Sequence, residues 1–237
     1  MKFKNIFFGF LKTLLLTVVF HIGLLCANEY MIFDLQNYQP TDNSPPPYFF
    51  QRDPATGDLV RLTDTEGGFQ FKTYNLQLKA DLAQYKIEVK PTLLRWKEKI
   101  IPLEKDSSSS SFFSGDLANK VDAQSSKRPP PREVHVATYK DRIEAVSYVN
   151  NRKPESPEID ILTANPEGMR VGQTTNVKGA GSALLDYELK TFKGRGAESA
   201  QLLSIRDKYY LDRGWKIDFD HWIEVEDSDD QSSCEGE

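Results

Sequence analysis

The stretch that decides the fold is Asn176-Val-Lys-Gly-Ala-Gly-Ser-Ala-Leu184, in which two glycines precede a helix-like run. Glycine has no Cβ atom, so the backbone at Gly179 and Gly181 can approach a ligand closely. The first N–H groups of a helix point out of its N-terminus, and the helix dipole favours an anion there. The sequence therefore predicts a helix over 179–193 whose start can hold a phosphate group. Gly-x-Gly also occurs at ordinary helix starts and turns, so the motif alone does not decide between these readings.

In several segments around this helix, apolar and polar residues alternate as they do in β-strands. Before it, the spacing of apolar residues predicts three strands, and the gap at Lys140-Asp141 predicts a hairpin between the first two. After it come a strand, a short helix ended by Gly214, and a last strand. The predicted ranges are 133–138, 142–149 and 158–164 before the helix, and 199–205, 206–213 and 216–225 after it. The order strand, strand, strand, helix, strand, helix, strand predicts an α+β fold.

The upstream part of the chain is expected to add further strands and helices. Short strand-like runs occur at 59–62 and 69–74, after a turn-rich stretch over 38–58. Residues 75–100 show loose helical spacing, and Pro91 is expected to divide them into two short helices.

About thirty residues past the glycines comes Lys208-Tyr-Tyr-Leu-Asp-Arg-Gly-Trp215, and this order resembles the GCN5-related N-acetyltransferase (GNAT) superfamily. The acetyl-CoA loop of that family has the form Arg/Gln-x-x-Gly-x-Gly/Ala, usually with Leu three residues on. Gly179, Gly181 and Leu184 match this form, and Asn176 stands where Arg or Gln is usual. The family commonly has a Tyr five residues before the aromatic of a Gly-Phe pair, and Tyr210 matches this spacing to Trp215. The resemblance covers roughly residues 133–226.

The resemblance implies a mixed, mostly antiparallel central sheet with flanking helices and a splayed pair of parallel strands at 158–164 and 199–205. It also implies acetyl-CoA as the co-substrate. The backbone groups of Leu162 and Ala164 would bond the pantetheine arm. The loop that would hold the diphosphate consists of Asn176, Val177, Lys178, Gly179, Ala180 and Gly181.

The same resemblance implies how the transfer would proceed. The acceptor is an amine on a small molecule or a protein, and a carboxylate or a water chain takes its proton; Asp160 and Glu158 lie on the right strand for this role. Tyr210 occupies the family's position for protonating the departing thiolate, and Tyr209 competes for this assignment. A polar residue in an alternating strand also commonly faces water, and a tyrosine on a short helix also commonly packs.

The first 27 residues have the layout of a secretory signal peptide. Three lysines precede or enter an apolar stretch that ends at Leu25-Cys-Ala27, a tolerable cleavage site. We favour cleavage, which makes the protein periplasmic or secreted. An uncleaved single-span anchor is the alternative, and it is the one way in which this chain would contact a membrane. A lipoprotein at Cys26 is disfavoured because Leu25 stands where a small residue is expected.

The composition of each segment predicts how the chain is divided, and the overall composition argues against nucleic-acid binding and a metal centre. The predicted order is a signal peptide over 1–27, a β-α-α portion over 28–104, a disordered Ser/Pro-rich linker over 105–132, the GNAT-like core over 133–226 and an acidic disordered tail over 227–237. The formal charge of −5 without a basic cluster argues against nucleic-acid binding. Two Cys and three His make a metal centre improbable.

Export and acetyl-CoA conflict, because acetyl-CoA is a cytosolic compound. The leading hypothesis, an exported N-acetyltransferase that uses direct attack of the amine, resolves the conflict if the protein acts inside a host cell. The alternative is a secreted, non-catalytic binding or interaction protein that keeps the GNAT fold. No Ser-His-Asp order or Cys-His pair is evident. His135, between two valines on a predicted strand, is expected to face solvent.

Overall fold

The computed structural model describes residues 29–40, 44–99, 104–123 and 131–219. The predicted signal segment over 1–27 and the predicted tail over 227–237 lie outside these residues. The chain divides into two compact units, of which the first is 1–31 with 203–237 and the second is 32–202. This division differs from the predicted one, because residues 32–202 join the β-α-α portion and most of the predicted core in one unit.

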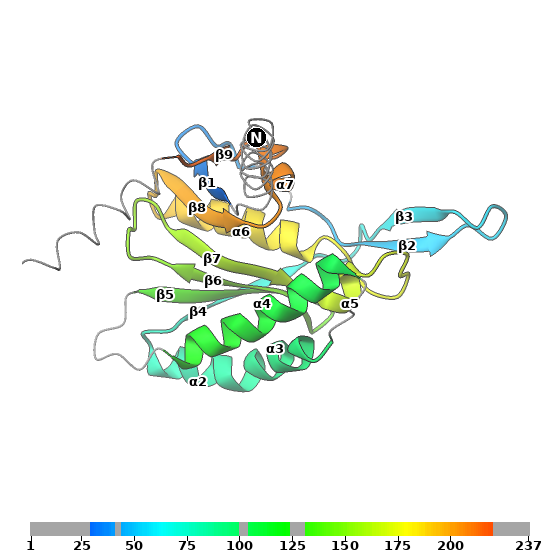
Figure 1. Cartoon of the computed structure of the whole chain (residues 1–237), viewed down its shortest axis with the longest axis horizontal. Helices are drawn as coiled ribbons and strands as arrows, with labels where there is room; N and C mark the ends of the chain where they lie inside the picture. Colours follow the sequence, from blue (N-terminus) through cyan, green and yellow to red (C-terminus); the bar gives the residue numbers. More distant parts are fainter. Residues whose placement is uncertain (1–28, 41–43, 100–103, 124–130, 220–237) are drawn as a thin grey trace, which may run out of the picture. The chain divides into compact units, whose positions relative to one another are not determined.

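The second unit contains most of the strands and helices (Figure 1). Two strands, β1 Glu29–Asp34 and β8 Ser199–Ser204, lie partly in each unit. The elements that lie wholly in the second unit are β2 Tyr48–Arg52, β3 Leu59–Thr63, β4 Gln70–Asn75, α2 Lys79–Glu88, α3 Lys90–Lys97, α4 Lys105–Asp122, β5 Arg132–Tyr139, β6 Arg142–Asn150, β7 Glu158–Ala164, α5 Pro166–Met169 and α6 Ala180–Gly194. The elements that remain, α7 Asp207–Leu211 and β9 Lys216–Ile217, follow in the first unit.

The larger sheet has seven strands in the order β4-β5-β6-β7-β8-β1-β9, and β2 and β3 form a separate hairpin. The strands from β4 to β7 pair antiparallel, whereas β7 and β8 pair parallel. The predicted fold class, a mixed and mostly antiparallel sheet with flanking helices, is confirmed.

Side-chain alternation assigns the two faces of the sheet in the second unit. Val136 of β5 and Val146 of β6 face the core that α2, α3 and α4 cover. Their neighbours Ala137 and Ala145 face the opposite way and pack against α6. Successive residues of a strand point to opposite faces, so both faces are apolar and helices cover both (Figure 1).

The predicted break between two short helices is also confirmed. Helix α2 ends at Glu88, and α3 begins at Lys90 with Pro91 in its first turn. Proline lacks an N–H group, but the first N–H groups of a helix have no partner within the helix, so proline is tolerated there.

The prediction of a disordered linker over 105–132 is wrong for 105–122, which form the 18-residue helix α4. Of the five serines at 107–111 that suggested disorder, Ser107, Ser110 and Ser111 are buried, and their hydroxyl groups are bonded. Ser107 donates to the carbonyl of Pro166 at 3.0 Å, and Ser110 bonds Thr163 of β7 at 2.9 Å. Because these partners replace water, the polar side chains can pack against β7 and α5.

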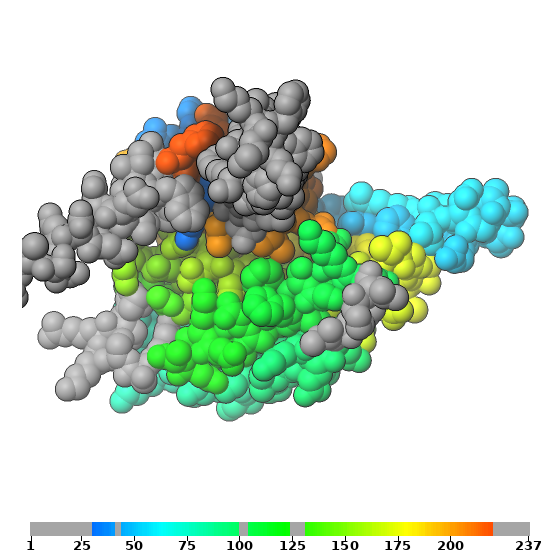
Figure 2. Space-filling model, in the orientation of Figure 1, coloured from blue at the N-terminus to red at the C-terminus, as the bar shows by residue number. Residues whose placement is uncertain are grey.

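Two further expectations for the second unit are corrected. His135 is fully buried between β4, β5 and α6 rather than facing solvent. The turn-rich stretch over 38–58 contains strand β2, which pairs with β3 to form a hairpin. Figure 2 shows this hairpin standing out from the surface of the unit.

The described part of the first unit consists of short segments. Helix α7 is shorter than predicted, and β9 covers only two residues of the predicted strand over 216–225, of which 220–225 lie outside the described residues. The N–H of Asp218 donates to the carbonyl of Tyr30 at 2.7 Å. Across both units, none of the helices that the structure describes is long and apolar enough to cross a membrane.

Candidate functional site

Helix α6 begins at a glycine that the backbone geometry requires. Gly179 has a φ of +97°, in the left-handed region that favours glycine. A Cβ atom there would lie 3.2 Å from Cε1 of Tyr48 and 3.4 Å from the carbonyl oxygen of Pro46. No side chain of the described residues caps the N-terminus of α6. The predicted helix start is confirmed, and no capping side chain uses its first N–H groups.

Two of the amides that were predicted to hold the diphosphate already donate hydrogen bonds within the protein. The N–H of Asn176 donates to Oε1 of Gln173 at 2.8 Å, and the N–H of Lys178 donates to the carbonyl of Tyr48 at 2.8 Å. The N–H of Tyr48 donates in return to the carbonyl of Lys178 at 3.2 Å. These two amides are therefore already paired, and the predicted role of holding a diphosphate is left to residues 179–181, at the start of α6.

Two parallel strands of the second unit pair over only a short stretch. β7 and β8 pair at Glu158–Gln201 and at Ile159–Leu202, and β7 continues over 160–164 beyond these pairs. The resemblance to the GNAT superfamily implied two parallel neighbours here, and their separation beyond these pairs stays a prediction.

The residues that were predicted to bond the pantetheine arm lie on this free part of β7. The side chains of Leu162 and Ala164 pack toward α6, beside the buried Ala180. The carbonyl of Ala164 accepts a hydrogen bond from Oγ of Ser110 on α4. Val177, in the loop before α6, is buried and presents no polar group from its side chain.

The two predicted general bases also lie on β7. Oδ1 of Asp160 is 4.0 Å from Nζ of Lys120, and the Asp160 side chain is 19% exposed. Oε2 of Glu158 accepts from Nδ2 of Asn150 at 3.4 Å. Neither carboxylate lines the cavity described below, and their roles stay predictions.

Tyr210 lies on α7 in the first unit. Its ring stands edge-on to Trp215, with centroids 5.6 Å apart, and the N–H of Trp215 donates to the carbonyl of Tyr210 at 3.2 Å. Trp215 is buried, as expected for a packing residue. The competing Tyr209 lies under the guanidinium of Arg213, 3.7 Å from the ring centroid. The proton-donor role of Tyr210 stays a prediction.

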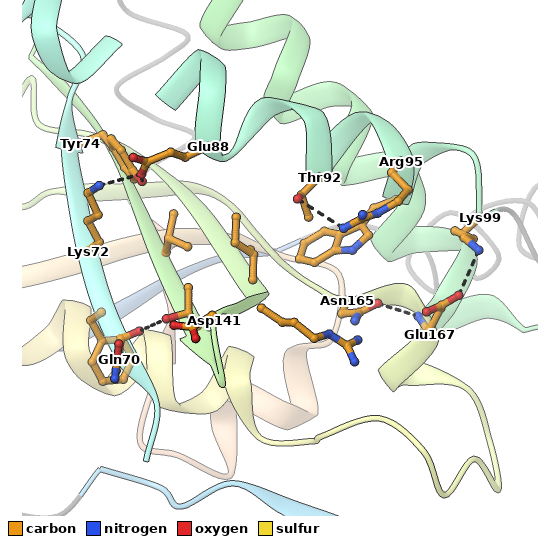
Figure 3. Close-up of a pocket in the computed structure, with 16 residues that line it drawn as sticks. Gln70, Lys72, Tyr74, Glu88, Thr92, Arg95, Lys99, Asp141, Asn165 and Glu167 are labelled. Carbon is orange, nitrogen blue, oxygen red and sulfur yellow. Dashed lines mark hydrogen bonds and ion pairs between the residues drawn. The ribbon is translucent and has the colours of Figure 1, made fainter. Parts of the chain in front are cut away.

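A cavity of about 930 Å³ in the second unit was not predicted from the sequence. It lies against β4, β5 and β6 on the side of α3, near the β5–β6 turn and α5 (Figure 3). Its apolar lining includes Trp96 from α3, Val136 from β5 and Ile143 from β6. These residues come from three separate elements, and strand register together with helix packing brings them side by side.

Charged pairs surround this apolar lining (Figure 3). Glu88 accepts from Nζ of Lys72 at 2.7 Å and from the hydroxyl of Tyr74 at 2.6 Å, and these bonds lower the pKa of Glu88. Burial and the Glu88 bond raise the pKa of Tyr74 to about 12. Lys99 pairs with Glu167 at 3.1 Å on another part of the lining.

Arg95 is the exception to this pairing. Its Nη2 donates to Oγ1 of Thr92 at 3.4 Å, and no carboxylate among the described residues lies within ion-pair distance of it. The guanidinium is exposed at the cavity. An apolar lining beside a cation without a carboxylate partner suits a ligand with an apolar body and an anionic group.

Among the described residues, no group of three or more His, Cys, Asp or Glu side chains could hold a metal ion. The structure does not test the prediction that the chain does not bind nucleic acid, so it stays a prediction.

No protein-family model matches this chain, and no curated protein sequence matches it. Among solved structures, it is similar to the C-terminal DUF2156 domain of a protein described as a lysylphosphatidylglycerol synthetase from Agrobacterium fabrum, with 12% identity, a TM-score of 0.39, and coverage of 74% of this chain and 46% of that one. It is also similar to a tandem GNAT protein from the clavulanic acid biosynthesis pathway, with 11% identity, a TM-score of 0.39, and coverage of 81% of this chain and 50% of that one. The chain thus spans about half the length of these structures.

Proposed function

We propose that this chain is an acyltransferase of the GNAT type, which transfers an acetyl group from acetyl-CoA to an amine. The single observation that carries the proposal is the arrangement around α6 in the second unit. β7 and β8 are parallel neighbours that pair only at two residue positions, and the helix that connects them starts at the left-handed Gly179 without a capping side chain. Such a helix start favours an anion.

Each predicted residue has a part in this proposal. The amides of Gly179, Ala180 and Gly181 would hold the diphosphate of the coenzyme. When bound, acetyl-CoA supplies an acyl thioester, which an amine can attack directly. Asp160 or Glu158 would accept the proton of the attacking amine. Tyr210 is proposed to donate a proton to the thiolate that leaves.

Export is part of the same proposal. We propose that residues 1–27 direct the chain out of the cytoplasm, and that it meets acetyl-CoA inside a host cell. The acceptor is then a small molecule or a protein that carries an amine.

Gly181 offers a sharp test of coenzyme binding. A Cβ atom at this position would lie 3.8 Å from Cβ of Ala164, which is an ordinary contact, so a side chain fits there. Replacing Gly181 by Asp puts a negative charge in the first turn of α6, where it favours the helix but repels a diphosphate. We expect the Kd for acetyl-CoA in a calorimetric titration to rise by about tenfold or more, or about 1.4 kcal/mol.

The matched control is Gly181→Ala, which adds the Cβ atom without the charge and should change the Kd by less than about twofold, well under 1 kcal/mol. Thermal unfolding reports that both variants are folded. If folded wild-type protein shows no binding, or if Gly181→Asp binds as well as wild type, the coenzyme site is wrong. If acetyl-CoA binds but no tested amine is acetylated, the catalytic part is wrong.

A secreted, non-catalytic binding protein with the same fold is the second candidate. Two observations favour it: Tyr48 already bonds the amide of Lys178 and covers Gly179, and a separate cavity holds a guanidinium without a carboxylate partner. In this reading, the cavity at Arg95 is the binding site and the start of α6 is structural.

The fluorescent sulfonate 8-anilinonaphthalene-1-sulfonate, which combines an aromatic body with an anionic group, tests this cavity. We expect Arg95→Gln to weaken its binding by about tenfold, because charge-assisted hydrogen bonds contribute roughly 1.5–3 kcal/mol. Arg52→Gln, on the β2–β3 hairpin, is the matched control and should leave the fluorescence titration unchanged. Equal titrations for wild type and Arg95→Gln would contradict an anion site at Arg95.

A further inference from the structure

A threonine, a histidine and a glutamate meet on the α6 side of the sheet, far along the chain from the coenzyme loop. Thr73 of β4 and His135 of β5 are direct partners in the antiparallel register, and Oγ1 of Thr73 lies 2.9 Å from Nδ1 of His135. Glu133 is two residues before His135 on β5, so its side chain points to the same face. Its Oε2 lies 3.3 Å from Nε2 of His135.

The charge state of Glu133 follows from its neighbours. Burial alone would raise its pKa, but its contacts with His135 and with Arg195 at 2.7 Å outweigh burial and lower the pKa to about 2. Glu133 is therefore an ionised carboxylate at neutral pH and can only accept protons from its partners.

The position of the proton on His135 follows in turn. Burial lowers the pKa of His135, so the ring is neutral at neutral pH and carries one N–H group. The 3.3 Å contact is not aligned as an ordinary hydrogen bond, yet a lone pair on Nε2 facing the carboxylate would be repelled. The proton therefore lies on Nε2, and Nδ1 accepts the hydroxyl proton of Thr73.

Tyr187 of α6 completes the chain of hydrogen bonds. Its hydroxyl lies 3.1 Å from Oγ1 of Thr73. Because the hydroxyl proton of Thr73 goes to His135, Tyr187 must be the donor in this bond. The hydroxyl of Thr73 is thus fixed in direction, and Thr73 is half-buried, whereas His135 is fully buried.

We propose that Thr73 is the nucleophile of a hydroxyl–imidazole–carboxylate site that takes an acyl group from an activated ester. The three side chains lie as such a site requires: a hydroxyl is in hydrogen-bond reach of a base, and a carboxylate beside the base stabilises its charged form. This site does not depend on the proposed coenzyme site, because its three reacting side chains lie on β4 and β5 and it requires no acetyl-CoA.

The acyl group is transferred to Thr73 in two steps. Oγ1 of Thr73 forms a bond to the carbonyl carbon of the ester while its proton moves to Nδ1 of His135, and Glu133 stabilises the imidazolium that results. The bond from the carbonyl carbon to the leaving oxygen then breaks, and that oxygen takes the bonding electron pair and the proton from Nδ1. The products are the free alcohol or phenol and an ester on Thr73. Water can then attack this ester, with His135 accepting the proton of the water and returning it to Oγ1.

The surroundings indicate which esters fit. Phe71, two residues before Thr73 and on the same face of β4, stacks on Tyr187 with centroids 4.7 Å apart and ring planes 7° apart. This half-buried aromatic pair lies next to the Thr73 hydroxyl, to which the hydroxyl of Tyr187 is bonded. Aryl esters with a small acyl group are therefore the expected class of substrate.

The test is to incubate the full chain with p-nitrophenyl acetate and to map acetylated peptides by mass spectrometry. We expect one acetyl group on the peptide that contains Thr73. Thr73→Val, which keeps the side-chain volume, should abolish this labelling, and Thr73→Ser should retain it. Absence of acetyl on Thr73 in folded wild-type protein, together with release of p-nitrophenolate at the same rate by wild type and Thr73→Val, would overturn the proposal.

Two further variants separate activation from mere accessibility. Glu133→Gln keeps the size of the side chain but removes the negative charge that holds the proton on Nε2, so we expect labelling of Thr73 to slow by about a hundredfold or more. Thr191→Val is the matched control: Thr191 is a half-buried hydroxyl on α6 that bonds the carbonyl of Tyr187 at 2.8 Å and has no imidazole partner. Its loss should leave labelling of Thr73 unchanged. Labelling of Glu133→Gln at the wild-type rate, with thermal unfolding showing that both proteins are folded, would overturn the assignment of His135 and Glu133.

Discussion

Replacing Glu188 by glutamine is expected to raise the stability of the variant relative to wild type by several kcal/mol as the pH increases from 5 to 8. Glu188 lies on α6 and is fully buried. Burial, with a smaller contribution from the charge of Glu133, raises its pKa from 4.5 to about 8, although a hydrogen bond from Ser147 acts in the opposite direction. Its Oε2 has no hydrogen-bond partner among the described residues. The folded protein therefore keeps this carboxyl group protonated at neutral pH.

The sign of the pH dependence follows from this raised pKa. Between pH 4.5 and about 8, the unfolded chain releases the Glu188 proton while the folded chain retains it. The contribution of Glu188 to the free energy of unfolding therefore falls by about 1.4 kcal/mol for each pH unit in this window. Glutamine has nearly the same shape, can accept from Ser147, and does not ionise.

Denaturant unfolding at several pH values measures this effect. The difference in free energy of unfolding between Glu188→Gln and wild type should increase steadily from pH 5 to pH 8. Glu198→Gln, an exposed carboxylate in the same unit, is the control and should track wild type. Parallel curves for Glu188→Gln and wild type would contradict the buried, protonated state of Glu188.

From residue 133 on, the order of the longer strands and helices was predictable from the sequence because alternation and helical spacing are local properties. The hairpin at Lys140-Asp141, the break at Pro91 and the helix after Gly179 all follow from neighbouring residues. These features established the α+β fold without knowledge of the register.

The candidate sites depended instead on contacts between distant segments. Thr73 meets His135 only through the register of β4 and β5, so no spacing in the sequence could show that a hydroxyl reaches the imidazole. The same holds for Tyr48, which bonds the amide of Lys178 across 130 residues of chain. His135 was misassigned because strand alternation tells which residues share a face but not whether a helix covers that face.

Helix α4 shows a different limit of composition. Five consecutive serines suggested disorder, because low hydrophobicity offers little apolar surface to bury. The structure instead buries serines whose hydroxyl groups find partners: Ser114 donates to the carbonyl of Ser110 at 2.7 Å, and Ser111 donates to that of Ser107 at 3.0 Å. Composition counts polar atoms but not the partners that a fold supplies for them.

Replacing Leu117 by alanine tests whether α4 is a structural part of this core. Leu117 lies in the C-terminal half of α4, is fully buried, and packs in the same cluster as Leu93 of α3 and Val146 of β6. We expect Leu117→Ala to lower the free energy of unfolding by about 2–5 kcal/mol, the cost of a lost side chain plus the cavity it leaves. The measurement is denaturant unfolding monitored by circular dichroism.

Phe112 supplies the matched control because it lies on the same helix but is 68% exposed. Phe112→Ala removes a larger side chain, yet it should change the free energy of unfolding by less than about 1 kcal/mol, since little packed surface is lost. If α4 were a linker without fixed structure, Leu117→Ala would be as neutral as Phe112→Ala. A large cost at Leu117 together with a small cost at Phe112 would therefore establish that the serine-rich helix contributes one face to the core, because only a packed helix distinguishes its two sides.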